Sequence, residues 1–123
     1  MGLPKVHRLK NRQDFRAVYE KGIRRYSPHL TLIALHSGDQ QGVKVTAKTQ
    51  LGISVSKKVS KKAVVRNRIK RQLKQAITLN LKLISPGWKV IIVVKPKAIE
   101  CKYEHFLREL EELLKKAKII DGY

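Results

Sequence analysis

The sequence is short of several features on which whole classes of protein depend. It has one cysteine among 123 residues, Cys101, so neither an internal disulfide nor a cysteine-based zinc site is expected. Its longest apolar run, Val90 to Val94, is too short for a transmembrane helix. No charged segment leads into an apolar stretch, as it does in a secretory signal. We therefore expect a reduced, cytoplasmic protein with no membrane partner, in which residues 1–123 form a single domain.

Acidic residues are scarce and unevenly placed. There are 28 Lys and Arg against nine Asp and Glu, giving a net charge of +19. Residues 1–39 carry a net charge of +5, residues 40–99 carry fifteen basic residues and no acid, and residues 100–123 carry −1. A surface charged only for solubility mixes the two signs. One sign concentrated in one segment indicates a polyanion, and nucleic acid is favoured over a membrane surface because no basic helix has an aromatic or leucine face for lipid.

The same scarcity of acids argues against a nuclease centre on this chain. A two-metal nuclease gathers carboxylates around its ions, and the middle of the chain has none to offer. The four histidines are scattered, and none lies near carboxylates at the spacing of a metal site or a catalytic triad. They are His7, His29, His36 and His105. We expect no catalytic residue and no metal ligand here.

The hydrophobic pattern predicts several short elements before the middle of the chain. Residues 1–8 are expected to form a mobile basic arm, followed by a helix from about Arg12 to Lys21 that begins after Asn11 and ends at Gly22. Two strands are predicted at 30–36 and 51–56, and their closeness in sequence suggests an antiparallel pair. The segment 43–49 fits either a strand extension or a loop.

The second half alternates longer helices with one strand. Ser60 resembles the N-cap of a helix from Lys61 to about Lys82, and a second helix is predicted from Tyr103 to Lys116. Between them the β-branched run 90–94 is typical of a central strand covered on both faces. The order α-β-β-(β)-α-β-α predicts an α+β sandwich, a small sheet with helices.

The helix that begins near residue 61 carries the most informative segment. Residues 61–74 hold seven positive charges and no negative one. On a helical wheel the apolar side chains form one stripe and most of the cations fill the opposite arc. Like charges at i,i+4 repel one another, so a partner that relieves the repulsion is expected, although a face that is merely solvated is the simpler alternative. Arginine suits phosphate because its planar fork donates two hydrogen bonds, and Asn67 between two arginines suits a 2′-hydroxyl or a base edge.

This segment contains a specific sequence motif, Lys62-Ala63-Val64-Val65-Arg66-Asn67-Arg68-Ile69-Lys70-Arg71. It resembles the Arg-Asn-Arg signature helix of the bacterial ribonuclease P protein subunit. Residues 51–58 (Leu-Gly-Ile-Ser-Val-Ser-Lys-Lys) are similar to the strand that leads into that helix, and Leu9, Asp14-Phe15, Tyr19 and Gly22 are similar to the family's first helix. Length, charge and element order agree as well, so the resemblance covers nearly the whole chain.

The resemblance implies more than composition does. The family fold is α-β-β-β-α-β-α, with a small mixed sheet and a left-handed βαβ crossover through the basic helix, against the usual right-handed preference. The implied partners are the catalytic RNA of ribonuclease P and precursor tRNA. The implied reaction is endonucleolytic hydrolysis that removes the 5′ leader and produces the mature tRNA 5′ end, with Mg²⁺ held mainly by the RNA. The chain would be an accessory subunit, monomeric when alone.

The resemblance also implies two sets of site residues. The RNA-facing helix would present Arg66, Asn67, Arg68, Lys70 and Arg71, and the charge pattern of the same segment adds Lys61, Lys62 and Lys74 as expected RNA contacts. The leader would lie in a cleft beside Phe15, Tyr19, Ser54, Ser56, Lys57 and Lys58. From spacing alone, Phe15 and Tyr19 at i,i+4 fit a core position as well as a stacking platform for bases. The alternative function is that of a ribosomal or structural RNA-binding protein with no role in cleavage.

Overall fold

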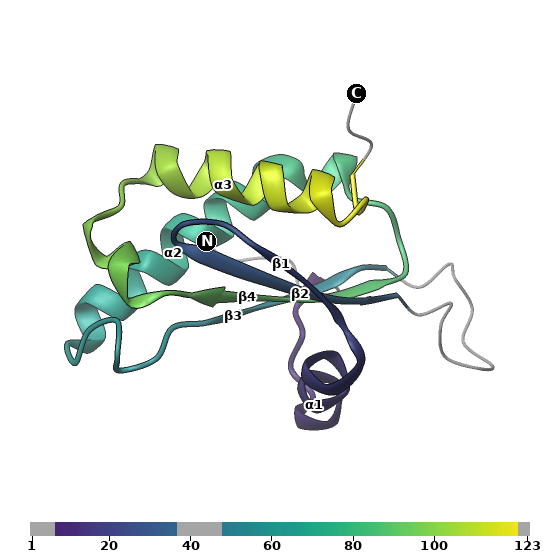
Figure 1. Ribbon diagram of the computed structural model, residues 1–123, viewed down its shortest axis with the longest axis horizontal. Helices are drawn as coiled ribbons and strands as arrows, with labels where there is room; N and C mark the ends of the chain where they lie inside the picture. The colour runs from purple at the N-terminus through teal and green to yellow at the C-terminus, as the bar shows by residue number, and fades with distance from the viewer. Residues whose placement is uncertain (1–6, 37–47, 121–123) are drawn as a thin grey trace.

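The computed structural model describes residues 7–36 and 48–120, which form one sheet and the helices that cover it (Figure 1). In chain order the elements are α1 (Arg12–Lys21), β1 (Ile23–Tyr26), β2 (Leu30–His36), β3 (Gln50–Ser54), α2 (Ala63–Asn80), β4 (Trp88–Val94) and α3 (Tyr103–Lys116). Two 3₁₀ turns, η3 (Leu81–Leu83) and η4 (Pro96–Glu100), flank β4. This order confirms the α+β sandwich. No helix among the described residues combines the length and apolarity that a membrane span requires.

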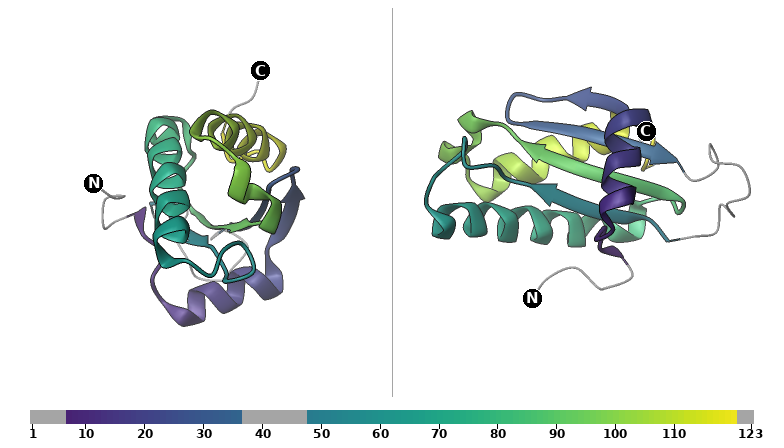
Figure 2. Two further views of the ribbon diagram at one scale, coloured as in Figure 1. Left: turned by 90° about the vertical axis from the view of Figure 1, so that its left-hand side faces the viewer. Right: turned by 90° about the horizontal axis from the view of Figure 1, so that it is seen from below.

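The four strands are ordered β1-β2-β4-β3, with β4 antiparallel to β2 and parallel to β3. The predicted antiparallel pair of the strands at 30–36 and 51–56 is therefore wrong, because β4 lies between them. Since residues 90–94 of β4 are an uninterrupted apolar run, this strand gains most from a central position where both of its faces are covered. The chain passes from β3 through α2 to β4, and Figure 2 shows that this crossover is left-handed, as the resemblance implies.

Strand β1 has no counterpart in the elements predicted from the hydrophobic pattern. Most of β1 is exposed, and its centre consists of Arg24 and Arg25. An edge strand with little buried surface leaves almost no alternation of apolar and polar residues to recognise. It is held by its register with β2, in which Ile23 pairs with Ala34 and Tyr26 with Thr31.

The helix bounds follow the predictions closely, with one correction at α2. Its first helical residue is Ala63 and its N-cap is Lys62, which makes no side-chain cap hydrogen bond. Ser60 lies outside the helix, where its hydroxyl accepts a hydrogen bond from the Lys62 amide at 3.2 Å. The serine therefore shapes the approach to the helix and does not cap it. The expected strand or loop at 43–49 lies mostly outside the described residues.

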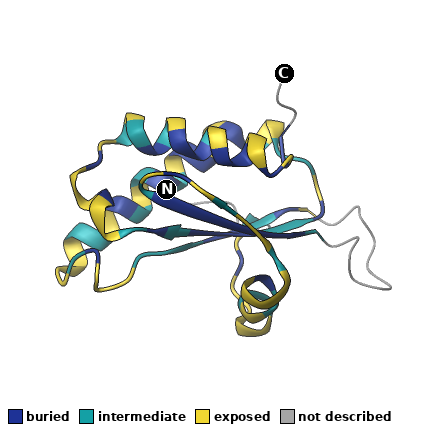
Figure 3. Cartoon of the chain, viewed as in Figure 1, coloured by how far each residue is buried: buried dark blue, intermediate teal, exposed yellow. Residues whose placement is uncertain are grey.

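The sheet has a hydrophobic layer on each face, as the burial colours of Figure 3 show. Helices α2 and α3 cover one face over the larger layer, and α1 lies on the other (Figure 2). The side chains of β2 alternate between the two layers. Leu30 and Leu32 face α2 and α3, whereas Ile33 and Leu35 face α1. The smaller layer contains few residues, so α1 is attached by a modest apolar surface together with the ion pair of Lys89 Nζ with Asp14 Oδ1 at 2.9 Å.

One carboxylate, Glu109 on α3, is buried with only 4% of its surface exposed. Its Oε1 accepts hydrogen bonds from the Ser27 hydroxyl at 2.6 Å and the His29 amide at 2.9 Å, and its Oε2 lies 2.7 Å from His29 Nδ1. Burial raises the pKa of Glu109, but these hydrogen bonds outweigh burial and hold the pKa below its ordinary value of 4.5. The ionised carboxylate therefore links α3 to the turn between β1 and β2.

This link predicts a pH-dependent contribution to stability. Because the folded-state pKa lies below the unfolded value, the stabilisation is complete above about pH 4.5 and is lost as the pH falls through the folded pKa. We expect Glu109→Gln to lower the free energy of unfolding by about 1–3 kcal/mol at pH 7, with a difference from wild type that shrinks below pH 4.5. Urea unfolding at several pH values measures it, with Glu112→Gln as the exposed control on the same helix. A difference that is constant with pH would contradict the assignment.

Candidate nucleic-acid interface

Helix α2 is placed by its apolar stripe. Ile69, Leu73, Ala76 and Ile77 are completely buried, and Val65 packs against them at the edge. Burial of a large aliphatic side chain contributes ~1.5–3 kcal/mol, whereas one like-charged i,i+4 pair opposes the helix by ~0.2–0.5 kcal/mol. The apolar contacts therefore decide the orientation of the helix, and the repulsion among its cations is tolerated.

The predicted RNA-facing side chains are all accessible. Lys61, Lys62, Asn67, Arg68 and Arg71 are exposed, and Arg66, Lys70 and Lys74 are half-buried. In the part of the chain that the structure describes, the three ion pairs are Arg16 with Glu20, His29 with Glu109 and Lys89 with Asp14. None of them involves α2, so no carboxylate of residues 7–36 or 48–120 forms an ion pair with this helix. Its positive charge is available to a polyanion.

Two arginines at the start of α2 also contact the chain itself. Arg66 Nη1 donates to the Ser60 carbonyl at 2.8 Å, and Arg68 Nη2 donates to the Ile99 carbonyl at 3.4 Å. These contacts use one nitrogen of each guanidinium and leave other N–H donors free for a ligand. The arginines are thus oriented by the segments on either side of the helix.

A cleft of about 220 Å³ lies beside α2, where the chain before α1 passes β3. Its walls come from four segments of the chain and combine apolar side chains with cations, without a carboxylate. The lining residues are Arg8, Leu9, Lys10, Phe15, Leu51, Gly52, Ile53, Lys70 and Lys74. A groove of this composition suits a single nucleic-acid strand, which has phosphates on one side and bases on the other.

Phe15 and Gly52 lie against each other in this cleft. Gly52 lies in β3, and a Cβ placed on it would be 2.6 Å from Phe15 Cζ and 3.0 Å from Cε1. The tip of the ring therefore occupies the space that a side chain at position 52 would need. Phe15 is half-buried, so it packs against the smaller hydrophobic layer and also faces the cleft. Phe15 therefore takes part in the core and also lines the cleft, and its role as a platform for bases stays a prediction.

The structure separates the other predicted cleft residues from this hollow. Tyr19, one turn further along α1, is 39% exposed and is not part of the lining. Ser54 is half-buried at the end of β3, and the loop that follows it is exposed. In that loop the Ser56 hydroxyl accepts a hydrogen bond from the Lys58 amide at 3.2 Å, and Lys57 lies between them. These residues lie on the path from the strand to α2, outside the lining of the cleft.

Sequence reasoning assigned Lys70 and Lys74 to the helix surface but not to the cleft, and it missed Arg8 and Lys10 as lining residues. It placed residues 1–8 in a mobile arm, of which the structure describes His7 and Arg8. His7 Nδ1 lies 2.8 Å from the Thr49 carbonyl, and Arg8 forms a parallel bridge with Leu51. Residues 1–6 lie outside the described part. The single sequence signal that this segment packs against the sheet was Leu9, an apolar residue within a basic stretch. The side chain of Leu9 is buried.

A small α+β sandwich with a basic helix that lacks neutralising carboxylates, beside an aromatic and cationic cleft, defines a nucleic-acid-binding protein. Comparison with known proteins gives the family. Residues 3–118 match the family model described as Ribonuclease P. The chain belongs to the ribonuclease P protein family.

Individual relatives agree over the whole length. The ribonuclease P protein component of Microcystis aeruginosa is 57% identical over 100% of both chains, and that of Rippkaea orientalis is 54% identical over 100% of this chain and 95% of the relative. Among solved structures, the RNase P protein of Staphylococcus aureus is 27% identical and matches with a TM-score of 0.80, over 95% of this chain and 100% of that one. The family resemblance of the signature helix is thereby confirmed.

The contact of Phe15 with Gly52 predicts a coupled pair. We expect Gly52→Ala to lower the free energy of unfolding by about 1–3 kcal/mol, because the new methyl group must displace the ring. Phe15→Leu in the same chain should recover part of that loss, so the double variant is more stable than the sum of the two single changes predicts. Urea unfolding of the four proteins measures the coupling. Additive effects would show that the ring and the strand do not share this space.

Proposed function

We propose that this chain is the protein subunit of ribonuclease P, and that it supports hydrolysis of the phosphodiester bond that releases the 5′ leader of precursor tRNA. The observation that carries the proposal is the array of seven cations in residues 61–74 with no carboxylate partner on α2, next to the cleft that contains Phe15. Family membership favours this function over the ribosomal alternative. The protein acts in the cytoplasm, is a monomer when alone, and has the catalytic RNA as its partner.

The exposed face of α2 binds the catalytic RNA. Arg68 and Arg71 present planar forks to phosphates, and Asn67 between Arg66 and Arg68 offers a neutral donor and acceptor to a 2′-hydroxyl. The apolar stripe on the opposite face fixes the helix, so these groups need little reordering when RNA binds. Counterions released from the RNA then contribute most of the affinity.

The cleft receives the single-stranded leader. Lys70 and Lys74 belong both to α2 and to the cleft wall, so the leader would lie directly alongside the RNA-binding face. Phe15 offers a ring to a base, and Arg8 and Lys10 extend the cationic wall. Tyr19 adds a second aromatic side chain along α1. The leader-binding surface continues toward the start of α2 through Ser54, Ser56, Lys57 and Lys58, as further leader contacts.

The cutting step belongs to the RNA. In the proposed reaction Mg²⁺ would activate water and stabilise the leaving oxygen. The residues that line the cleft include no carboxylate, so they do not fit as ligands for such ions. RNA phosphates would hold the Mg²⁺, while this chain binds and orients the substrate.

Reconstitution tests the proposal. The purified chain is combined with the ribonuclease P RNA of the same organism and a precursor tRNA at physiological magnesium. We expect 5′ maturation to be faster than with the RNA alone, and no cleavage by the chain alone. Cleavage by the isolated chain, or no stimulation of the RNA, would overturn the proposal. Recovery of ribosomal RNA in place of this RNA from cells would favour the ribosomal alternative.

The contribution of α2 is measured by salt dependence. We expect Lys70→Ala/Lys74→Ala to reduce the slope of log affinity against log salt by about 2, because two phosphate contacts are lost. The matched control is Lys115→Ala/Lys116→Ala, a pair of exposed lysines on α3, which should leave the slope unchanged. Filter binding between 50 and 200 mM salt gives the slopes. If both double variants reduced the slope equally, RNA would bind to positive charge anywhere on the surface and not to a defined interface on α2.

The platform role of Phe15 has a separate test. Phe15→Leu keeps an apolar side chain of similar size but removes the ring, and loss of stacking on one base costs ~1–3 kcal/mol. We expect the affinity of the reconstituted complex for precursor tRNA to fall by roughly 5- to 150-fold, with little change for mature tRNA. An equal loss for both substrates would assign Phe15 to packing alone.

A further inference from the structure

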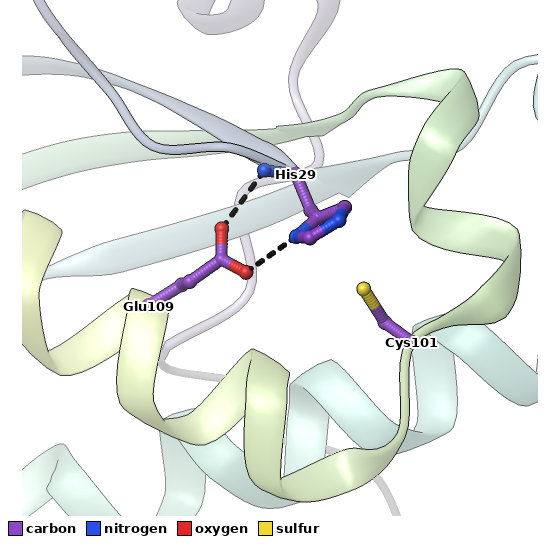
Figure 4. A group of neighbouring side chains, drawn as sticks. All are labelled: His29, Cys101 and Glu109. Carbon is purple, nitrogen blue, oxygen red and sulfur yellow. Dashed lines mark hydrogen bonds and ion pairs between the residues drawn. The ribbon is translucent and has the colours of Figure 1, made fainter.

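Three side chains that can bind a metal ion meet on the part of the molecule where α3 passes the start of β2 (Figure 4). His29 precedes β2, Cys101 follows η4, and Glu109 lies on α3. One potential ligand atom from each lies within 4.8 Å of the other two. None of the three lines the cleft or belongs to α2, so the nucleic-acid interface does not account for them.

The nitrogen and oxygen donors are already fixed in position. His29 Nδ1 and Glu109 Oε2 are 2.7 Å apart, and the other carboxylate oxygen of Glu109 is held by the Ser27 hydroxyl and the His29 amide. With only 4% of its surface exposed, Glu109 carries a negative charge inside the protein, and its single close charge partner among the described residues is the imidazole. A divalent cation in place of the proton between His29 Nδ1 and Glu109 Oε2 would neutralise this carboxylate more fully.

Cys101 supplies the third donor and decides the kind of metal. Its side chain is 9% exposed and is directed toward the His29 ring (Figure 4). Its thiol pKa is raised by burial and then by the negative charges of Glu109 and Glu100, so the thiol keeps its proton until a cation arrives. A bound divalent ion reverses both effects, because it favours the thiolate and releases the proton.

We propose that His29, Cys101 and Glu109 bind one zinc-class divalent ion, with a water molecule in the fourth position. The donor set of nitrogen, sulfur and oxygen selects zinc over magnesium or calcium, which prefer oxygen alone. His29 leaves an entry path, since 29% of its side chain is exposed. The ion would cross-link the turn before β2, the segment after η4 and α3.

The geometry needs only a small adjustment. With metal–ligand bonds of ~2.0–2.3 Å, the ligand atoms of a tetrahedral zinc ion lie roughly 3.3–3.8 Å apart. His29 Nδ1 and Glu109 Oε2, which are 2.7 Å apart, must therefore separate by roughly half an ångström, and a pair at the 4.8 Å limit of the cluster must close by about an ångström. Rotation about side-chain torsions covers such a distance without a change of the backbone.

The test uses Co²⁺ as a spectroscopic substitute for zinc on the full chain, kept reduced and free of RNA. We expect one equivalent of Co²⁺ to give a thiolate-to-cobalt charge-transfer band together with the visible bands of tetrahedral cobalt, and Zn²⁺ to abolish both. Zn²⁺ should also raise the Tm of the wild-type chain. Because no RNA is present, failure of this test leaves the proposed function untouched.

Variants distinguish the cluster from adventitious binding. Cys101→Ser should remove the charge-transfer band, and His29→Asn should weaken Co²⁺ binding by roughly tenfold or more. His36→Asn, which removes a histidine outside the cluster, should leave both unchanged. The Tm of each variant without metal shows whether it is folded. Absence of the band in wild type, its persistence in His29→Asn, or a wild-type Tm that ignores Zn²⁺ would overturn the proposal.

Discussion

Burial of one apolar stripe is the interaction on which the rest of the molecule depends. Residues 61–74, which lead into α2 and form its first turns, carry seven cations, and α2 is still held firmly because Ile69, Leu73 and Ile77 are completely removed from water on its other face. The apolar contribution exceeds the repulsion between neighbouring charges several times over. The protein can therefore keep its positive charge unneutralised, and a bound polyanion would relieve the repulsion that remains.

Sequence periodicity predicted the helices well and the sheet poorly, for a physical reason. The bounds of α1 and α3 are determined by residues within one or two turns of each other, so local pattern is sufficient. The order β1-β2-β4-β3 depends on which strand gains most from the centre, a comparison among distant segments. The exposed β1, with two arginines in four residues, shows no local pattern at all.

The candidate site, too, was predictable where it depends on one helix and unpredictable where it depends on distant segments. The exposed face of α2 follows from helical geometry, and the structure leaves all eight predicted residues accessible. The cleft could not be predicted from spacing, because it is built by contacts such as Phe15 against Gly52, 37 positions apart. The same holds for His29 and Glu109, which are separated by 80 residues and meet only in the folded chain. The four histidines are scattered in the sequence, yet His29 meets a buried carboxylate in the folded chain.

The pairing of the first described residues with β3 has a consequence for solubility. Leu9 donates its amide to the Leu51 carbonyl at 3.0 Å, so the outer side of β3 does not present a free row of backbone donors and acceptors there. At the opposite border of the sheet, Arg24 and Arg25 place charge on β1. Both borders thus discourage strand addition from another copy, which protects the chain from aggregation through its sheet when no RNA covers it.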